Sequence, residues 1–288
     1  MTLPLTELFS QFNVEVVSPF GVMIRPRTAT AALTAVPVST ARDVARDCHL
    51  VIFRGFSGPS TPEQLAGYAA FWGQTLSWPF GEVLELVEHE RPADHVFDNT
   101  GISLHWDGMF ADRIPEFQIF QCINAGHQGQ GGRTIFCDTT LVLNHTDTAT
   151  RQLWKHLTLT YRVNKESHYG GIAVSDLVVN HPTRRFPTIR YLEPVPTNTD
   201  YVNRPHVTFH DVPPERIHEI EQTIHDALYD PRHCYAHEWH TDDIVIADNY
   251  TLLHGRQPYT TRCGRHLRRV HVLGEPPLRN PALRSSTQ

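Results

Sequence analysis

Short apolar runs bounded by glycine, proline or polar residues make up most of the hydrophobic pattern of this chain. Their length and their content of valine, isoleucine and phenylalanine favour buried strands over helices. Strands are predicted at 49–56, 83–87, 116–123, 134–137, 187–192 and 244–247. A glycine-rich stretch at 125–132 predicts a loop between two of these strands.

Three other segments repeat their apolar residues every three or four positions, which is the spacing of one helix face. These faces are Leu65, Tyr68, Ala69 and Trp72 in 61–74; Leu153, Trp154 and Leu157 in 148–157; and Ile217, Ile220, Ile224 and Leu228 in 214–229. The first segment begins with Thr61-Pro62-Glu63-Gln64, which has the form of a capping box with proline at the first helical position. Asp147 lies near the start of the second segment, where it suits a helix cap.

Many short strands with few helices are typical of antiparallel β-barrels. We therefore predict a mainly β fold with flanking helices, namely a double-stranded β-helix, or jelly-roll barrel. The helices at 61–74 and 214–229 are expected to brace one sheet from outside. We expect one domain spanning 1–288, because the candidate metal ligands described below lie far apart in sequence. The range from about 165 to 214, rich in proline and glycine, predicts a lid or insertion.

Composition excludes several classes of protein. The net charge is −6, so the chain has no general attraction for nucleic acid or an anionic membrane. The five cysteines are scattered and odd in number, which argues against a disulfide framework and a structural zinc site. No apolar run approaches the length of about 20 residues that a membrane span needs. No signal peptide is visible at the N-terminus, and the cytoplasm is the expected location.

The most informative motif is His105-Trp106-Asp107. Side chains two positions apart in a strand point the same way, so this imidazole and carboxylate face a common point. A second imidazole would complete the set of two histidines and one carboxylate that marks a non-haem iron(II) centre. His254, which follows the predicted strand at 244–247, is the candidate for that second imidazole.

Two other His-x-Asp motifs compete with this choice. His145-Thr146-Asp147 has a plain explanation as a loop and a helix cap, and His240-Thr241-Asp242 as a polar turn before a strand. We therefore do not assign either of them to the metal. The chain has 19 histidines, so position along the chain matters more than residue type.

Arg265 follows His254 in the segment 264–273. A guanidinium matches a carboxylate with two parallel hydrogen bonds, so near an iron centre Arg265 suits the distal carboxylate of 2-oxoglutarate. Taken singly, each residue has an ordinary structural explanation: a hydrogen-bonded strand-end histidine for His105 or His254, and a surface ion pair for Arg265. Their joint order and spacing favour the metal site.

With these residues the chain resembles the taurine-dioxygenase-like family of iron(II)/2-oxoglutarate oxygenases. The resemblance is carried by His105-x-Asp107, Gly131-Gly132-Arg133-Thr134, His254 and Arg265, and it extends from about Leu50 to about Glu275. Within that family the chain closely resembles the tyrosine isocyanide desaturases of paerucumarin and rhabduscin biosynthesis. The segments 78–88, 104–110, 242–256 and 265–271 carry this closer similarity.

The resemblance implies a jelly-roll fold, an Fe(II) cofactor, and 2-oxoglutarate and O2 as co-substrates. It implies that His105, Asp107 and His254 are the metal-binding and catalytic residues, and that Thr134 helps Arg265 to hold 2-oxoglutarate. It also implies that Arg269 contacts the anionic group of the second substrate. Asn99, in the loop before the first ligand, is a further candidate for a substrate contact, although asparagine there is more often a turn residue.

The resemblance further implies a substrate, tyrosine isocyanide, which would be desaturated between its α and β carbons with or without loss of the carboxylate. An isocyanide synthase is the expected supplier of that substrate. One alternative is a hydroxylase of another small carboxylate or sulfonate in the same family. A jelly-roll binding module and a zinc hydrolase are further alternatives, but both leave Arg265 without a role.

Overall fold

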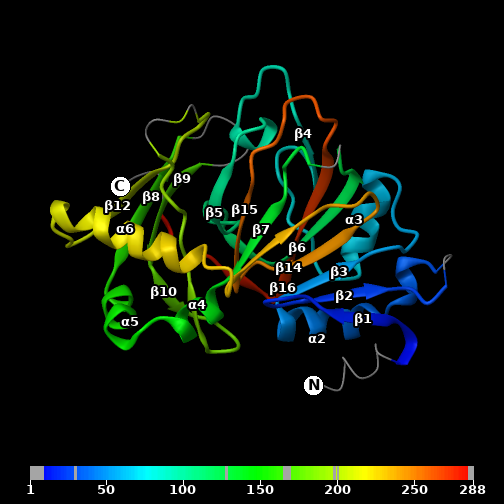
Figure 1. The fold of residues 1–288 in the computed structure, drawn as a ribbon, viewed down its shortest axis with the longest axis horizontal. Coiled ribbons are helices and arrows are strands. Elements are labelled where there is room, and N and C mark those ends of the chain that lie inside the picture. The colour runs from blue at the N-terminus through cyan, green and yellow to red at the C-terminus, as the bar shows by residue number, and fades with distance from the viewer. Residues whose placement is uncertain are drawn as a thin grey trace.

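Two β-sheets form the centre of the computed structural model, which describes residues 10–28, 31–126, 129–164, 170–196, 199 and 201–284 (Figure 1). The larger sheet has the strand order β1 (Asn13–Val16), β2 (Val22–Arg25), β3 (Leu50–Phe53), β14 (Ile244–Asp248), β6 (Arg113–Asn124), β16 (His266–Arg279) and β4 (Val83–Val87). The smaller sheet has the order β13 (Cys234–His237), β7 (Thr134–Asp138), β15 (Leu252–Arg256) and β5 (Ile102–His105). The jelly-roll fold predicted from the strand pattern is confirmed.

Alternation along the central strands decides which side chains enter the space between the two sheets. In β6, Phe120 belongs to the apolar cluster between the sheets, whereas its neighbour Ile119 faces the other side of the larger sheet. In β15, Leu252 faces inward and Leu253 faces outward. This period of two places every second residue of β15, β6 and β16 in the interior of the barrel.

The outer face of the larger sheet is covered by α2 (Val38–Cys48) and α3 (Pro62–Ala70), with the short 3₁₀ turn Leu33–Ala35 beside them. Helix α3 begins where its capping box predicts, and the Thr61 hydroxyl accepts a hydrogen bond from the Gln64 amide at 3.3 Å. The helix ends at Ala70, earlier than the predicted 74, although Trp72 beyond its end is still buried.

The outer face of the smaller sheet packs against a second group of elements, on the left of Figure 1. These are α4 (Thr139–His145), α5 (Thr148–Lys155), α6 (Pro214–Leu228), the sheet β12 (His206–Phe209), β8 (Thr158–Val163), β9 (Gly171–Asp176) and β17 (Leu283–Arg284), and the hairpin β10 (Val178–Asn180) with β11 (Pro187–Ile189). The prediction that helices 61–74 and 214–229 brace the same sheet was therefore wrong. Helix α6 packs its apolar face on this second group instead.

Two details of the region 139–157 also differ from the sequence prediction. Leu153 is 41% exposed, so the inward face of α5 is carried by Trp154, with Leu157 buried just beyond the helix end. His145 does not lie in a loop but is the last residue of α4, which the hydrophobic pattern did not indicate. Asp147 caps α5 as expected, because its carboxylate accepts from the amides of Ala149 and Thr150.

The range predicted as a lid or insertion contains strands β9 to β12 and supplies part of a cavity wall described below. Residues 165–169, 197, 198 and 200 of that range lie outside the described residues, and its role as a lid stays a prediction. Another short 3₁₀ turn, His95–Phe97, precedes β5.

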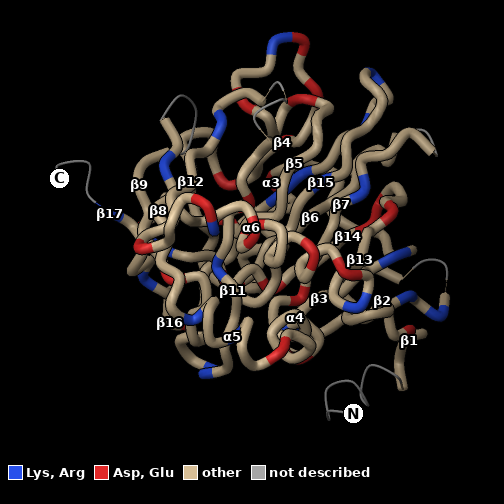
Figure 2. The backbone as a smooth tube through the Cα atoms, turned by 60° about the vertical axis from the view of Figure 1, so that its left-hand side comes forward, with Lys and Arg blue, Asp and Glu red and all other residues tan. Residues whose placement is uncertain are grey.

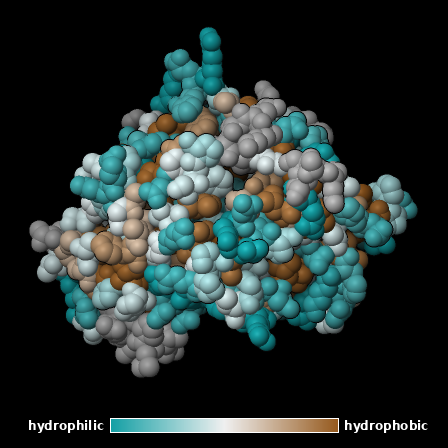
Figure 3. All heavy atoms as spheres, turned by 180° about the vertical axis from the view of Figure 1, so that it is seen from behind, coloured by the Kyte–Doolittle hydropathy of each residue, from teal (hydrophilic) through white to brown (hydrophobic). Residues whose placement is uncertain are grey.

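The surface carries charges of both signs. Acidic and basic residues are interspersed along the described backbone, as Figure 2 shows. Seen from behind, hydrophobic residues form separate patches among polar ones (Figure 3). Among the described residues, no helix is both long and apolar enough to cross a membrane.

Candidate active site

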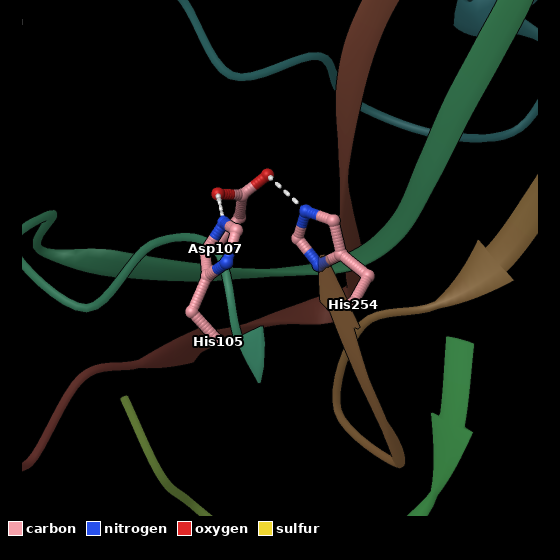
Figure 4. A group of neighbouring side chains, drawn as sticks. All are labelled: His105, Asp107 and His254. Atoms are coloured by element: carbon pink, nitrogen blue, oxygen red, sulfur yellow. Dashed lines mark ion pairs between the residues drawn. The ribbon is translucent and has the colours of Figure 1, made fainter. Parts of the chain in front are cut away.

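Three predicted ligands lie together between the two sheets (Figure 4). One ligand atom from each of His105, Asp107 and His254 lies within 4.8 Å of the other two. The His105 Nε2 atom is 3.6 Å from Asp107 Oδ1, and the His254 Nε2 atom is 3.7 Å from Asp107 Oδ2. No other group of three potential ligands with this spacing occurs in the described part of the chain.

Strand pairing brings the two histidines together. His254 in β15 is the direct antiparallel partner of His105 in β5, and their ring centroids are 4.2 Å apart. The next residue, Gly255, lies at an irregularity of this ladder. A Cβ atom at Gly255 would lie 2.5 Å from the carbonyl oxygen of Ile102, so a larger residue would push the two strands apart.

Asp107 lies beyond the end of β5, and Asn249 fixes its backbone there. The Asn249 Oδ1 atom accepts from the Asp107 amide at 2.9 Å, while its Nδ2 donates to the carbonyl oxygens of Asp107 and Pro115, both at 2.9 Å. Asn249 is 1% exposed. Sequence reasoning missed this role, because its cause is a pairing between segments far apart along the chain.

Replacing Asn249 with alanine is expected to lower the free energy of unfolding by about 2–4 kcal/mol, because it leaves buried backbone groups at Asp107 and Pro115 without partners. Urea unfolding followed by circular dichroism measures the change. The exposed Asn180 provides a matched control, and Asn180→Ala should change the unfolding free energy by no more than about 0.5 kcal/mol. Equal stability of the two variants would contradict the role of Asn249.

The charges of the group suit metal binding at neutral pH. Burial tends to raise the pKa of the Asp107 carboxyl, but Arg269, His271 and His254 outweigh burial and hold that pKa well below its usual range. Burial and the neighbouring His105 lower the pKa of His254 well below its ordinary value. The site therefore presents an ionised carboxylate and a neutral imidazole, the forms that bind a metal.

Hydrogen bonds fix the directions of the ligand atoms. His105 Nδ1 lies 2.9 Å from the carbonyl oxygen of Ser103, which can only accept, so Nδ1 carries the proton and Nε2 keeps its lone pair. Asp107 Oδ2 accepts hydrogen bonds from Gln118 Nε2 at 2.6 Å and His271 Nε2 at 2.8 Å, and it forms an ion pair with Arg269 Nη1 at 2.7 Å. This crowding leaves Oδ1 as the oxygen available to a metal. The donor set of two imidazoles and one carboxylate fits iron(II).

A cavity of about 420 Å³, including its open mouth, joins two of the ligands, His105 and His254, to the arginine predicted to bind 2-oxoglutarate. His105, His254, Thr134, Arg265 and Arg269 are among its lining residues. Thr134 is buried in β7, and its hydroxyl accepts from the indole nitrogen of Trp239 at 3.0 Å. The wall of this cavity therefore combines two candidate metal ligands with a hydroxyl and guanidinium groups.

Arg265 is a buried cation whose surroundings supply little negative charge. Its Nε donates to the carbonyl oxygen of Gly132 at 3.0 Å. Burial and the nearby Arg256 lower the pKa of Arg265 to about 10, and no carboxylate is among the groups with the largest influence on it. A buried guanidinium of this kind gains from an anionic ligand.

A second cavity, of about 770 Å³ including its open mouth, lies beside the same ligands. Its wall is mostly apolar and includes Val96, Ile102, Met109, Phe110, Val163 and Leu192. Trp78, His105, Asp107, Arg269 and His271 also line it. Arg269 therefore lies between the two cavities, and its buried Nε atom has no hydrogen-bond partner among the described residues.

The remaining candidate residues of the sequence analysis lie outside the ligand group. Asn99 is not among the residues that line either cavity, and its amide donates to the carbonyl oxygen of Tyr259 at 3.0 Å. A substrate contact by Asn99 stays a prediction. His145 pairs with His233 at 2.8 Å, and His240 is an exposed residue of the turn before β14.

The fold has counterparts in known proteins. The family model described as "Taurine catabolism dioxygenase TauD, TfdA family" matches residues 20–271. The chain belongs to this family. That match includes every residue of the site described above.

Individual members of this dioxygenase family are similar over almost their whole length. A tyrosine isonitrile desaturase of Pseudomonas aeruginosa is 40% identical over 265 residues, which cover 92% of this chain and 91% of that protein. A 3-((Z)-2-isocyanoethenyl)-1H-indole synthase of Fischerella ambigua is 35% identical over 267 residues, covering 93% of this chain and 97% of that protein. A solved structure of PvcB, an Fe, alpha-ketoglutarate dependent oxygenase from an isonitrile synthetic pathway, superposes with a TM-score of 0.82 at 36% identity and 96% coverage of both chains.

Proposed function

We propose that this protein is an iron(II)/2-oxoglutarate-dependent dioxygenase that desaturates tyrosine isocyanide between its α and β carbons. The observation that carries the proposal is the meeting of His105, Asp107 and His254 beside two cavities, both of which His105 lines. One cavity suits a small dicarboxylate, and the other suits a larger, mostly apolar molecule. The 40% identity to a tyrosine isonitrile desaturase supports the choice of substrate.

The three ligands would hold iron(II) through His105 Nε2, an imidazole nitrogen of His254 and Asp107 Oδ1. Arg265, with the Thr134 hydroxyl beside it in the same cavity wall, would bind the distal carboxylate of 2-oxoglutarate. When bound, iron(II) with 2-oxoglutarate and O2 supplies the oxidising power that removes hydrogen from a C–H bond of the substrate.

The protein's own contribution is placement of the substrate. We propose that the Arg269 guanidinium binds the carboxylate of tyrosine isocyanide, since it faces the larger cavity beside Asp107. The apolar wall of that cavity would enclose the aromatic ring. This arrangement keeps the α and β carbons, which lie between carboxylate and ring, close to the ligand group.

Overall, the substrate loses two hydrogens and two electrons, and conversion of 2-oxoglutarate to succinate and CO2 provides the other two electrons that reduce O2. The carboxylate of the substrate is either kept or lost as a second CO2. A para-hydroxyphenyl ring stabilises a radical or cation at the benzylic β carbon, which favours desaturation over addition of oxygen.

A turnover experiment tests this function. Purified protein is incubated with iron(II), ascorbate, 2-oxoglutarate and tyrosine isocyanide, and the products are measured by mass spectrometry. We expect a product lighter by two hydrogens, with or without loss of CO2, together with succinate. A saturated product heavier by one oxygen would identify a hydroxylase, and absence of succinate with every substrate would contradict a dioxygenase of this type.

The relative from Fischerella ambigua, named for an indole product, supplies the comparison substrate. The chain is 40% identical to the tyrosine isonitrile desaturase and 35% identical to the indole enzyme. We therefore expect tryptophan isocyanide to be converted more slowly than tyrosine isocyanide in the same assay. Faster conversion of the indole compound would assign the protein to that substrate instead.

We further propose that an isocyanide synthase supplies the substrate, because the proposed reaction leaves the isocyano group unchanged and some other enzyme must form it. We also propose a cytoplasmic location. All five cysteines of the chain are free, which fits a reducing compartment.

A further inference from the structure

Trp78 is connected to the Asp107 carboxylate through one intervening side chain. The Trp78 indole nitrogen lies 3.1 Å from His271 Nδ1, and His271 Nε2 lies 2.8 Å from Asp107 Oδ2. His271 is 2% exposed, so both of its ring nitrogens are confined to these partners.

The indole determines which nitrogen of His271 carries the proton. An indole N–H can donate a hydrogen bond but cannot accept one. His271 Nδ1 must therefore be the acceptor, and the ring proton must lie on Nε2. The imidazole is thus oriented as a donor to the Asp107 carboxylate.

This donor acts together with two others on the same oxygen. His271 in β16 is the direct antiparallel partner of Gln118 in β6, so neighbouring strands place both side chains beside Asp107 Oδ2. Arg269 approaches from two residues earlier in β16. With Oδ2 surrounded by donors, the carboxylate has one orientation that turns Oδ1 toward the point that His105 faces.

The backbone near Trp78 holds the indole at this position. The Leu76 amide donates to the carbonyl oxygen of His271 at 2.9 Å, which ties the segment before Trp78 to β16. Trp78 and Gly81 then exchange backbone hydrogen bonds in a tight turn, and the Phe80 ring stacks on the indole with a centroid distance of 6.1 Å. Trp78 also lines the larger cavity, so the same side chain faces the proposed substrate.

We propose that Trp78 is a positioning residue that, through His271, sets the orientation of the Asp107 carboxylate for the metal. The inference rests on the proposed metal site, but it does not depend on which substrate the protein oxidises. Removal of an outer hydrogen-bond partner of a metal ligand typically lowers metal affinity 10- to 100-fold.

The test measures Mn(II) binding to metal-free protein by isothermal titration calorimetry, without substrate or 2-oxoglutarate. Trp78→Phe keeps an aromatic ring but removes the N–H, and we expect its dissociation constant for Mn(II) to rise about tenfold. His271→Leu should have at least the same effect. His271→Gln should restore near-normal binding, because the glutamine amide can accept from Trp78 and donate to Asp107.

The double variant decides whether Trp78 acts through His271. If it does, Trp78→Phe causes no further loss when it is added to His271→Leu. Trp154→Phe removes an indole N–H that has no hydrogen-bond partner among the described residues, and it should leave Mn(II) affinity unchanged. Thermal unfolding of each metal-free variant establishes that the effect on binding is not a loss of fold.

Normal Mn(II) binding by folded Trp78→Phe would overturn the proposal, as would additive losses in the double variant. Failure of wild-type protein to bind Mn(II) at all would instead overturn the proposed metal site. Tyrosine isocyanide is absent from this test, so a wrong substrate cannot produce either result.

Discussion

His105→Ala is expected to reduce turnover by more than about a thousandfold, because the variant lacks one of three protein ligands and the iron loses both affinity and position. Little loss of stability is expected. The side chain is partly exposed in the cavity, and Nδ1 donates a hydrogen bond to the Ser103 carbonyl oxygen. Succinate formation from 2-oxoglutarate measures turnover, and metal analysis of the purified variant measures iron content.

His240→Ala is the matched control. His240 begins another His-x-Asp motif, but the structure places it on an exposed turn. Its replacement should leave succinate formation and iron content unchanged. Metal-dependent turnover that survives in His105→Ala would remove His105 from the ligand set, whatever the control shows.

The second large effect is expected for Arg265→Ala. Loss of a buried guanidinium that pairs with a carboxylate reduces the binding free energy by about 2–5 kcal/mol. The dissociation constant for 2-oxoglutarate should therefore rise roughly 30- to 4,000-fold. Arg265→Lys keeps the charge but loses the bidentate hydrogen bond, so its loss of 2-oxoglutarate affinity should be smaller than that of Arg265→Ala. Fluorescence titration of 2-oxoglutarate into anaerobic Mn(II)-protein measures the affinity.

Arg268 provides the control for this experiment. It is a buried arginine three positions later, but it faces the opposite side of β16 and pairs with Glu85 at 2.9 Å. Arg268→Ala should leave the affinity for 2-oxoglutarate unchanged. A normal affinity in Arg265→Ala would show that the keto acid is held elsewhere, with Arg269 as the next candidate because it lines the same cavity.

The strands could be predicted because their pattern is local. Runs such as 244–247 are apolar on both faces, since β14 lies in the middle of a sheet with the barrel interior on one side and helices on the other. The capping box at Thr61 likewise acts within one turn of helix. By contrast, α4 was missed, and Leu153 was placed on the wrong face of α5. Both segments pack against the added sheet and hairpin, whose position is not encoded locally.

The candidate ligands were identifiable because iron(II) sites use two imidazoles and one carboxylate, and because the order of these residues resembles that of a known family. The residues that surround these ligands could not be identified from the sequence. Asn249, Gln118, His271 and Trp78 are ordinary residues in the sequence, and their roles depend on pairings between β6, β16 and loops far away along the chain. One feature of the sequence could have indicated His271. It lies two positions after Arg269, so in a regular strand both side chains are on the face that points toward the site.

The sequence by itself determined the mainly β fold, the two histidines and carboxylate, and the arginine suited to a keto acid, because periodicity and donor chemistry can be recognised residue by residue. The tertiary structure decided which oxygen of Asp107 is free, which residues line the two cavities, and that the Asn99 amide donates to the Tyr259 carbonyl oxygen. Those properties depend on distances between strands that are distant in sequence, and only the packed sheets fix such distances.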